Sequence, residues 1–156
     1  MLDFKENFID KFTRYTAINT KSDHESNTVP TTKTQLELAN LLVKELSQIG
    51  AKDVNIDEFG YVTALIPANI EKKVPVIGFL AHMDTSPDAS GENVKTQIHK
   101  NYGGDDIVIS KDLNIILSPK DSPELLNYKG DDIITASGDT LLGGDDKAGI
   151  AVIMCV

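Results

Sequence analysis

The 156-residue sequence contains no tryptophan and one cysteine, Cys155. One thiol cannot form an intrachain disulfide, which excludes a disulfide-stabilised scaffold and favours a reducing compartment. Cys155 also lies in an apolar run, which is typical of a structural thiol and not of a nucleophile.

Long hydrophobic runs are absent as well. No apolar stretch approaches the roughly 20 residues that a helix needs to cross a bilayer. The sequence begins MLDFKE, with two acids and no continuous apolar stretch, unlike a secretory signal peptide. We therefore expect a cytoplasmic protein without a membrane partner.

Positive charge is scarce. There are 15 Lys and Arg against 24 Asp and Glu, so the formal net charge is -9. Such a chain repels phosphates, and we expect no nucleic-acid partner. The composition, 40% hydrophobic and 25% charged, is that of a soluble globular domain, and no linker divides residues 1–156.

Several catalytic motifs are missing. There is no Gly-x-Ser-x-Gly elbow for a serine hydrolase. Gly138 and Gly143 have the spacing of a phosphate-binding loop, but Asp145 and Asp146 follow where Lys and Ser or Thr are needed. The acids also lack the alternating spacing of an EF-hand.

Helical periodicity marks two segments. Phe4, Phe8, Phe12 and Tyr15 repeat at helical spacing and predict a packed helix. A second helix is predicted by apolar residues on one face, with Thr32 and Gln35 as a capping box and Gly50 at the C′ position. The residues of that face are Leu38, Leu41, Leu42, Leu46 and Ile49.

Strand patterns account for much of the remainder. Residues 54–57 and 61–66 predict a hairpin, and the polar residues 19–34 predict a loop. Short strands are expected at residues 107–109, 114–117 and 131–135, with a helical turn at 123–127. In the loop, His24 stands beside Asp23 and Glu25; a solvated histidine is the more ordinary interpretation than a surface metal site.

The apolar residues 75–81 predict a buried strand that ends at His82. Open α/β sheets bind ligands at such strand ends. His82 can be a metal ligand, and Asp84, two residues later, can support it. The ordinary alternative is a strand-end histidine whose hydrogen bonds are satisfied.

Asp145 and Asp146 favour a helix start, because acids complement the helix dipole there. From Ala148 the sequence is apolar, which predicts a mostly buried helix. Asp145 could share a zinc ion with His82, or could be an ordinary N-cap. The apolar run continues to Val156 without a cap, so we expect this chain to be part of a longer protein.

Two motifs together, His82-Met83-Asp84-Thr85-Ser86-Pro87-Asp88 and residues 140–149 (TLLGGDDKAG), resemble the di-zinc metallopeptidase family that includes aminoacylases and carboxypeptidases. Flanking residues, such as FTRY at 12–15, favour its tripeptide aminopeptidases. The resemblance implies an α/β catalytic domain, a mixed sheet flanked by helices, of which residues 1–156 are an incomplete N-terminal portion.

The resemblance also implies roles. His82 matches a zinc ligand, Asp145 the carboxylate that bridges two zinc ions, and Asp84 a catalytic role through the histidine it supports. The bond between Asp145 and Asp146 is then a non-proline cis peptide. The reaction implied is removal of the N-terminal residue of a tripeptide by water that two zinc ions activate.

In the family, the general base, the remaining ligands and a lid domain that commonly forms a homodimer lie beyond the equivalent of Val156. We therefore expect the chain alone to be inactive. Two alternatives stay open: another family member, such as a dipeptidase, carboxypeptidase or deacylase, or a non-catalytic binding or assembly module that keeps the fold.

Overall fold

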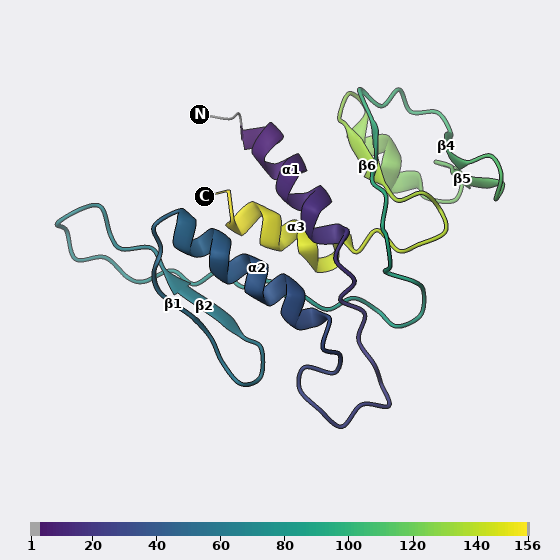
Figure 1. Cartoon of the computed structure of the whole chain (residues 1–156). Helices are drawn as coiled ribbons and strands as arrows, with labels where there is room; N and C mark the ends of the chain where they lie inside the picture. The colour runs from purple at the N-terminus through teal and green to yellow at the C-terminus, as the bar shows by residue number, and fades with distance from the viewer. Residues whose placement is uncertain (1–3, 156) are drawn as a thin grey trace.

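The computed structural model describes residues 4–155, which form three α-helices, a 3-10 helix and six strands (Figure 1). This mixture confirms the expected α/β class, and the strands form three separate antiparallel pairs, β1–β2, β3–β6 and β4–β5. The elements are α1 (Phe4–Thr16), α2 (Gln35–Gln48), β1 (Lys52–Ile56), β2 (Val62–Leu65), β3 (Gln97–His99), β4 (Ile107–Ser110), β5 (Ile115–Leu117), η1 (Pro123–Tyr128), β6 (Ile133–Thr135) and α3 (Gly144–Ile153).

The main core lies between the three helices (Figure 1). The predicted aromatic stripe of α1 is confirmed: Phe12 and Tyr15 are buried, and Phe8 stacks on Phe12 with ring centroids 5.6 Å apart. The side chain of Phe4 lies outside the described part. The buried members of the core are Phe12, Tyr15, Leu38, Leu42, Ile150, Ala151 and Met154.

Of the two caps predicted for α2, the structure confirms the one at the C-terminal end and not the one at the N-terminal end. Gly50 has φ +84°, and its N–H donates to the Ser47 carbonyl at 3.2 Å, which confirms the predicted C′ glycine. The predicted capping box is wrong. Thr32 Oγ1 donates instead to the Lys21 carbonyl at 2.8 Å, and no side chain caps the helix at Thr34. The Thr32 hydroxyl also accepts from Thr34 Oγ1 at 3.3 Å, and the Gln35 N–H donates to the Thr32 carbonyl instead of to the hydroxyl.

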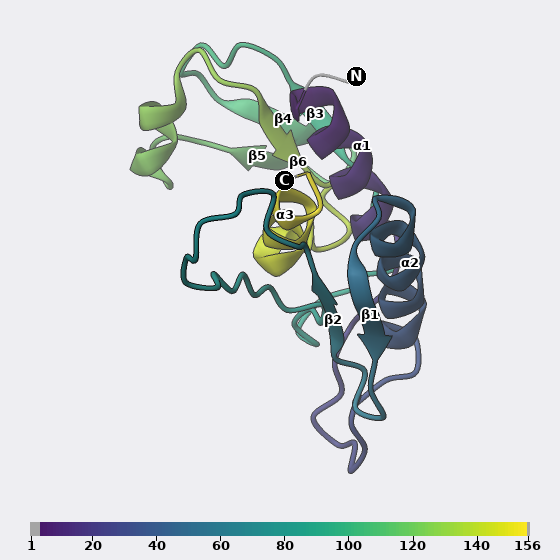
Figure 2. The ribbon, with the colours of Figure 1, turned by 90° about the vertical axis from the view of Figure 1, so that its left-hand side faces the viewer.

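The predicted hairpin is confirmed as β1 and β2, which run alongside α2 (Figure 2). Its turn is closed by Asp57, whose Oδ1 accepts from the N–H groups of Phe59 (3.0 Å) and Tyr61 (2.8 Å). This pattern is an Asx-type turn, which explains why a short loop with an acid at its start reverses the chain here.

A second, smaller core involves Tyr102, Ile107 and Leu125. It is formed by η1 and the four short strands β3 to β6, which lie at the upper right of Figure 1; in Figure 2, α1 runs beside β3. The expected strands near residues 107, 115 and 133 and the helical turn near 123 are confirmed. β3 was not expected, since its three residues carry too little pattern.

The predicted buried strand over residues 75–82 is wrong. The segment is extended but belongs to no strand, and Val76 and Leu80 are 87% and 94% exposed. A strand is stabilised by hydrogen bonds to a neighbouring strand. Within residues 4–155 no backbone–backbone hydrogen bond joins residues 66–84 to another segment.

The predicted helix at the end of the chain is α3. It packs against α1 and buries Ile150, Ala151 and Met154, whereas Val152 is 45% exposed. Burial is therefore less complete than the apolar sequence predicts. None of the helices within residues 4–155 combines the length and the apolarity that crossing a membrane requires.

Candidate metal centre

The segment that carries His82 is fixed at both sides of the histidine. Ala81 and Met83 pack against the main core. Successive residues of an extended chain point to opposite sides, so His82 and Asp84 project away from the core. Their side chains are 53% and 49% exposed. The apolar neighbours therefore orient the two polar groups.

Thr85 joins this segment to the loop that follows α1. Its N–H donates to the Thr20 carbonyl at 3.1 Å, and its own carbonyl accepts from the Ser22 N–H at 3.0 Å. Lys21 and Thr85 consequently form an isolated parallel bridge. This short bridge fixes the position of the backbone directly after His82 and Asp84.

The start of α3 positions Asp145. Gly143 precedes the helix with φ +71°, and the peptide bond between Asp145 and Asp146 is cis, which confirms the bond implied by the resemblance. Asp146 Oδ1 accepts from the Gly149 N–H at 3.0 Å. This bond satisfies one amide of the first turn, while the Asp145 side chain stays 95% exposed.

Lys147 anchors the same turn. It is 2% exposed, and its Nζ donates to the Ile18 carbonyl at 2.7 Å. Burial lowers the pKa of Lys147 to about 8. The sequence analysis assigned Lys147 no role, because one lysine at the head of an apolar helix looks like an ordinary solvent-facing charge.

The structure brings together the three residues that the sequence analysis selected. His82 Nδ1 lies 3.1 Å from Asp84 Oδ1 and 3.1 Å from the Asp84 carbonyl oxygen. His82 Nε2 lies 3.0 Å from Oδ1 of Asp145, 63 residues later. The imidazole thus sits between two carboxylates, and each ring nitrogen faces one of them.

These carboxylates change the titration of the imidazole. Partial burial by itself lowers the pKa of His82. The hydrogen bond to Asp145, together with the charge and hydrogen bonds of Asp84, outweighs this effect and raises the pKa above its ordinary value. His82 and Asp145 form an ion pair when the imidazole is protonated.

The donor chemistry fits part of a zinc site. Imidazole nitrogen and carboxylate oxygen are both zinc ligands, and at tetrahedral zinc two such atoms lie about 3.3 Å apart. The 3.0 Å between His82 Nε2 and Asp145 Oδ1 is close to that spacing. No group of three or more His, Cys, Asp or Glu side chains that could hold a metal ion occurs among residues 4–155. Among the described residues, His82 and Asp145 thus offer two possible ligand atoms but no complete ligand set.

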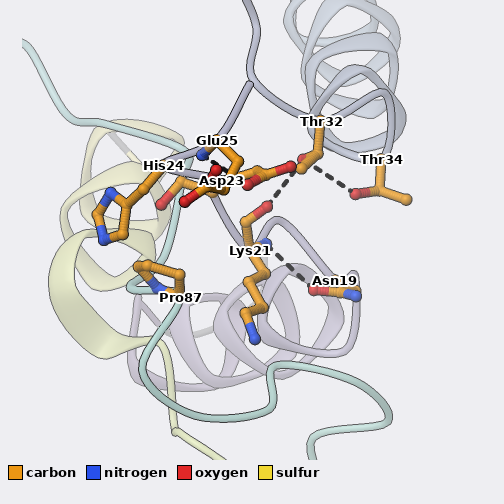
Figure 3. Close-up of a pocket in the computed structure, with 9 residues that line it drawn as sticks. Asn19, Lys21, Asp23, His24, Glu25, Thr32, Thr34 and Pro87 are labelled. Carbon is orange, nitrogen blue, oxygen red and sulfur yellow. Dashed lines mark hydrogen bonds between the residues drawn. The ribbon is translucent and has the colours of Figure 1, made fainter. Parts of the chain in front are cut away.

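A separate hollow lies over the loop between α1 and α2 (Figure 3). His24 and Pro87 border one side of it, and the Lys21 chain runs across it, with the Lys21 N–H bonded to Asn19 Oδ1 at 3.1 Å. His24 is exposed, as expected for a loop histidine. The lining residues are Asn19, Lys21, Ser22, Asp23, His24, Glu25, Thr32, Thr34 and Pro87.

Comparison with known proteins gives a consistent result. No family model matches the chain. Curated proteins named peptidase T do match: those of Listeria innocua (58% identity over 150 residues) and Clostridium acetobutylicum (60% over 149). The protein of Geobacillus thermodenitrificans is 57% identical over 150 residues. Each match covers 96% of this chain but only 36–37% of the relative's length. Over almost its whole length, this chain is therefore similar to little more than a third of peptidase T.

Proposed function

We propose that this chain supplies part of the catalytic domain of a zinc-dependent tripeptide aminopeptidase, with His82 and Asp145 as zinc ligands. The placement of the His82 imidazole between Asp84 and Asp145 carries the proposal. The identity to proteins named peptidase T supports it and favours an aminopeptidase over a dipeptidase, carboxypeptidase or deacylase.

Asp84 is the positioning residue in this proposal. Its Oδ1 and its carbonyl oxygen both lie within hydrogen-bond distance of His82 Nδ1. A proton held on Nδ1 leaves the lone pair of the neutral ring on Nε2, the nitrogen that faces Asp145. Asp84 thereby selects the tautomer that can bind a metal ion and fixes the ring plane.

Asp145 has the properties of a bridging ligand. Oδ1 faces His82, and the 95% exposed side chain leaves its second oxygen accessible. When bound, zinc ions would activate water and polarise the scissile carbonyl of the peptide. Lys147 and the hydrogen bond between Gly149 and Asp146 hold the turn from which Asp145 projects.

Further parts of the proposal concern the whole protein. The general base and the remaining ligands belong to the part of peptidase T that this chain does not cover. Residues 1–156 then form one portion of a catalytic domain in a cytoplasmic enzyme that can dimerise. Because two ligands cannot hold a zinc pair, we expect no tripeptide hydrolysis by the chain alone.

A chimera tests the proposal. This chain replaces the 150 matched residues of Listeria innocua peptidase T, and zinc content and hydrolysis of a peptide panel are measured. We expect release of the N-terminal residue from tripeptides. His82→Ala and Asp145→Asn should each reduce the rate of hydrolysis at least about 100-fold and lower the zinc content. Asp84→Ala should reduce the rate of hydrolysis or the affinity for zinc by about 10- to 100-fold.

His24→Ala is the matched control, since it removes an exposed loop imidazole and should leave hydrolysis unchanged. Full activity of the chimera after His82→Ala or Asp145→Asn would contradict the assignment of ligands. A preference for dipeptides, blocked N-termini or acylated amino acids would transfer the proposal to another member of the family.

A further inference from the structure

The candidate metal centre is built on two arms that come from separate parts of the chain. We define the histidine arm as residues 82–85 and the aspartate arm as residues 144–147. Within residues 4–155, no backbone–backbone hydrogen bond joins one arm to the other. Their side chains meet where His82 Nε2 lies 3.0 Å from Asp145 Oδ1, and both side chains are more than half exposed. An exposed ion pair contributes little stability, so other contacts must set the distance between the arms.

The histidine arm is tied to the loop that follows α1. The Thr85 N–H donates to the Thr20 carbonyl at 3.1 Å. The Thr85 carbonyl accepts from the Ser22 N–H and from Ser22 Oγ, both at 3.0 Å. Because Thr85 follows Asp84 directly, these three bonds fix the backbone next to the residue that supports the imidazole.

The aspartate arm is tied to the same loop. Lys147, two residues after Asp145, is 2% exposed, and its Nζ donates to the Ile18 carbonyl at 2.7 Å. A buried amino group without an acceptor is unfavourable, so the first turn of α3 follows the position of this carbonyl. A further tie, from the Leu141 N–H to the Ser90 carbonyl at 2.8 Å, lies outside the arm.

Residues 18–22, which we call the brace, are themselves held in place. The Ile18 N–H donates to the Tyr15 carbonyl at 3.2 Å, and Tyr15 is fully buried in the main core. Thr20 is also fully buried. The Lys21 carbonyl accepts from Thr32 Oγ1 at 2.8 Å (Figure 3). The brace is therefore a fixed segment that contacts both arms.

We propose that the brace is a positioning segment that sets the separation between the two zinc ligands. It acts on the histidine arm through Ser22 and Thr85, and on the aspartate arm through the Ile18 carbonyl and Lys147. The inference rests on the proposed function. Groups that orient metal ligands affect metal affinity although they do not touch the ion, and loss of such a group typically weakens binding about 10- to 100-fold. The brace thus contributes to the affinity for zinc without contributing a ligand.

Two substitutions in the chimera described above test the brace. Lys147→Met keeps the length of the buried stem but removes the donor to Ile18, and Ser22→Ala removes the Oγ bond to Thr85. We expect Lys147→Met to lower the affinity for zinc about tenfold, measured by competition with a chelator. Ser22→Ala should lower this affinity less, because its N–H still donates to Thr85.

Two further measurements separate positioning from general stability. In the free chain without metal, the amides of residues 144–147 should exchange faster in Lys147→Met, and the amide of Thr85 faster in Ser22→Ala. In the chimera with saturating zinc, kcat for tripeptide hydrolysis should fall and KM should change little, because the brace acts on the ligands.

Lys11→Met and Ser47→Ala are the matched controls. Lys11 is 9% exposed and its Nζ lies 3.5 Å from Glu45 Oε2, and Ser47 Oγ donates to the Val43 carbonyl at 2.8 Å. The controls remove a buried amino group and a hydroxyl-to-carbonyl bond outside the brace and both arms. They should leave the affinity for zinc unchanged.

Unchanged zinc affinity in both brace variants, or an equal loss in Lys11→Met and Lys147→Met, would overturn the role of the brace. Ser22→Ala keeps the test decisive if Lys147→Met does not fold. A chimera whose zinc affinity depends on the brace but which does not hydrolyse tripeptides would instead refute the proposed function and leave the brace in place.

Discussion

At the scale of single residues, the buried charge of Glu45 distinguishes the main core. Glu45 is 8% exposed and lies between α1 and α2, where its Oε2 accepts from the Tyr15 hydroxyl at 2.5 Å. Arg14 Nη2 lies 2.9 Å from Oε1, and Lys11 Nζ lies 3.5 Å from Oε2. A buried carboxylate is tolerated here because three donors share it.

This arrangement predicts a pH-dependent contribution to stability. Burial raises the pKa of Glu45, but the Tyr15 hydrogen bond and the charges of Arg14 and Lys11 outweigh it, so the pKa lies below its ordinary value. The unfolded chain then binds more protons than the folded chain as Glu45 titrates. The stability that Glu45 contributes is fully present above the ordinary pKa of a glutamate. It is lost as the pH falls through the lowered pKa of Glu45 in the folded chain.

Glu45→Gln should therefore reduce the free energy of unfolding near neutral pH by about 1.5–3 kcal/mol. It should also flatten the dependence of stability on pH in the acid range, as urea unfolding at a series of pH values would measure. Glu58→Gln, in the exposed turn of the β1–β2 hairpin, is the control and should change neither quantity. An unaltered acid-range slope in the Glu45 variant would refute the assignment.

At the residue level, short motifs in the sequence selected side chains that lie together in the structure, and the roles assigned to them stay predictions. A histidine followed two residues later by an aspartate, and a pair of aspartates after glycines, identified the groups that the structure brings together. The partners of Glu45 and Lys147 could not be predicted in this way. Their environments come from contacts with α1 and with Ile18, and no local pattern encodes these.

At the scale of elements, the entry into α3 depends on Gly143. Its φ of +71° is in the left-handed region, and a Cβ there would lie 3.2 Å from Thr85 Cγ2. Thr85 is buried and bridged to the Lys21 segment, so it cannot easily move aside. Glycine is therefore required both by the backbone conformation and by the space.

Three alanine substitutions separate these two requirements. Gly143→Ala should destabilise the chain by more than about 1 kcal/mol, because strain and a tight contact act together. At Gly50, φ is +84° but an added Cβ would meet no atom within 4 Å. Gly50→Ala should therefore lower the free energy of unfolding only through backbone strain. Gly78→Ala has neither problem and should be neutral.

Urea unfolding of the three variants gives the order, and equal effects of Gly50→Ala and Gly143→Ala would show that the Thr85 contact contributes nothing. In the zinc-loaded chimera, Gly143→Ala should also lower the zinc content, because it displaces the turn that carries Asp145.

Elements that are stabilised by local contacts were easier to predict than elements that depend on remote neighbours. The amphipathic pattern and the terminal glycine of α2 are local, and the helix was predicted nearly to its ends. A strand depends on neighbours that can be remote in sequence. Residues 75–82 have the composition of a buried strand, yet within residues 4–155 no strand lies beside them, so composition alone predicted the wrong environment.

At the scale of the molecule, stability is unevenly distributed. Among the described residues, seven buried side chains form the core between the helices, whereas three form the core under the β3–β6 and β4–β5 pairs. Residues 74–80 form no backbone–backbone hydrogen bond with another segment within the described part of the chain, and most of their apolar side chains are exposed. Regions with few buried apolar contacts open locally at little energetic cost.

Hydrogen exchange on the free chain should reflect this distribution. Amides of Leu38 and Leu42 should exchange slowest, those of β4 and β5 faster, and those of Val76 to Leu80 at close to the rate of an unfolded peptide. Mass spectrometry of peptic fragments would resolve these classes. Strong protection of residues 76–80 in the free, monomeric chain would contradict the structure.

The contact between His82 and Asp145 joins two points that are 63 residues apart in the sequence. A metal ion shared by these two side chains would therefore act as a crosslink. By the loop-closure estimate, crosslinking over that separation disfavours the unfolded chain by about 4 kcal/mol, as a disulfide of the same span would. This chain has one cysteine and cannot form an intrachain disulfide. A shared metal ion would supply a crosslink of that kind, so its removal would lower the free energy of unfolding as well as disturb the candidate metal centre.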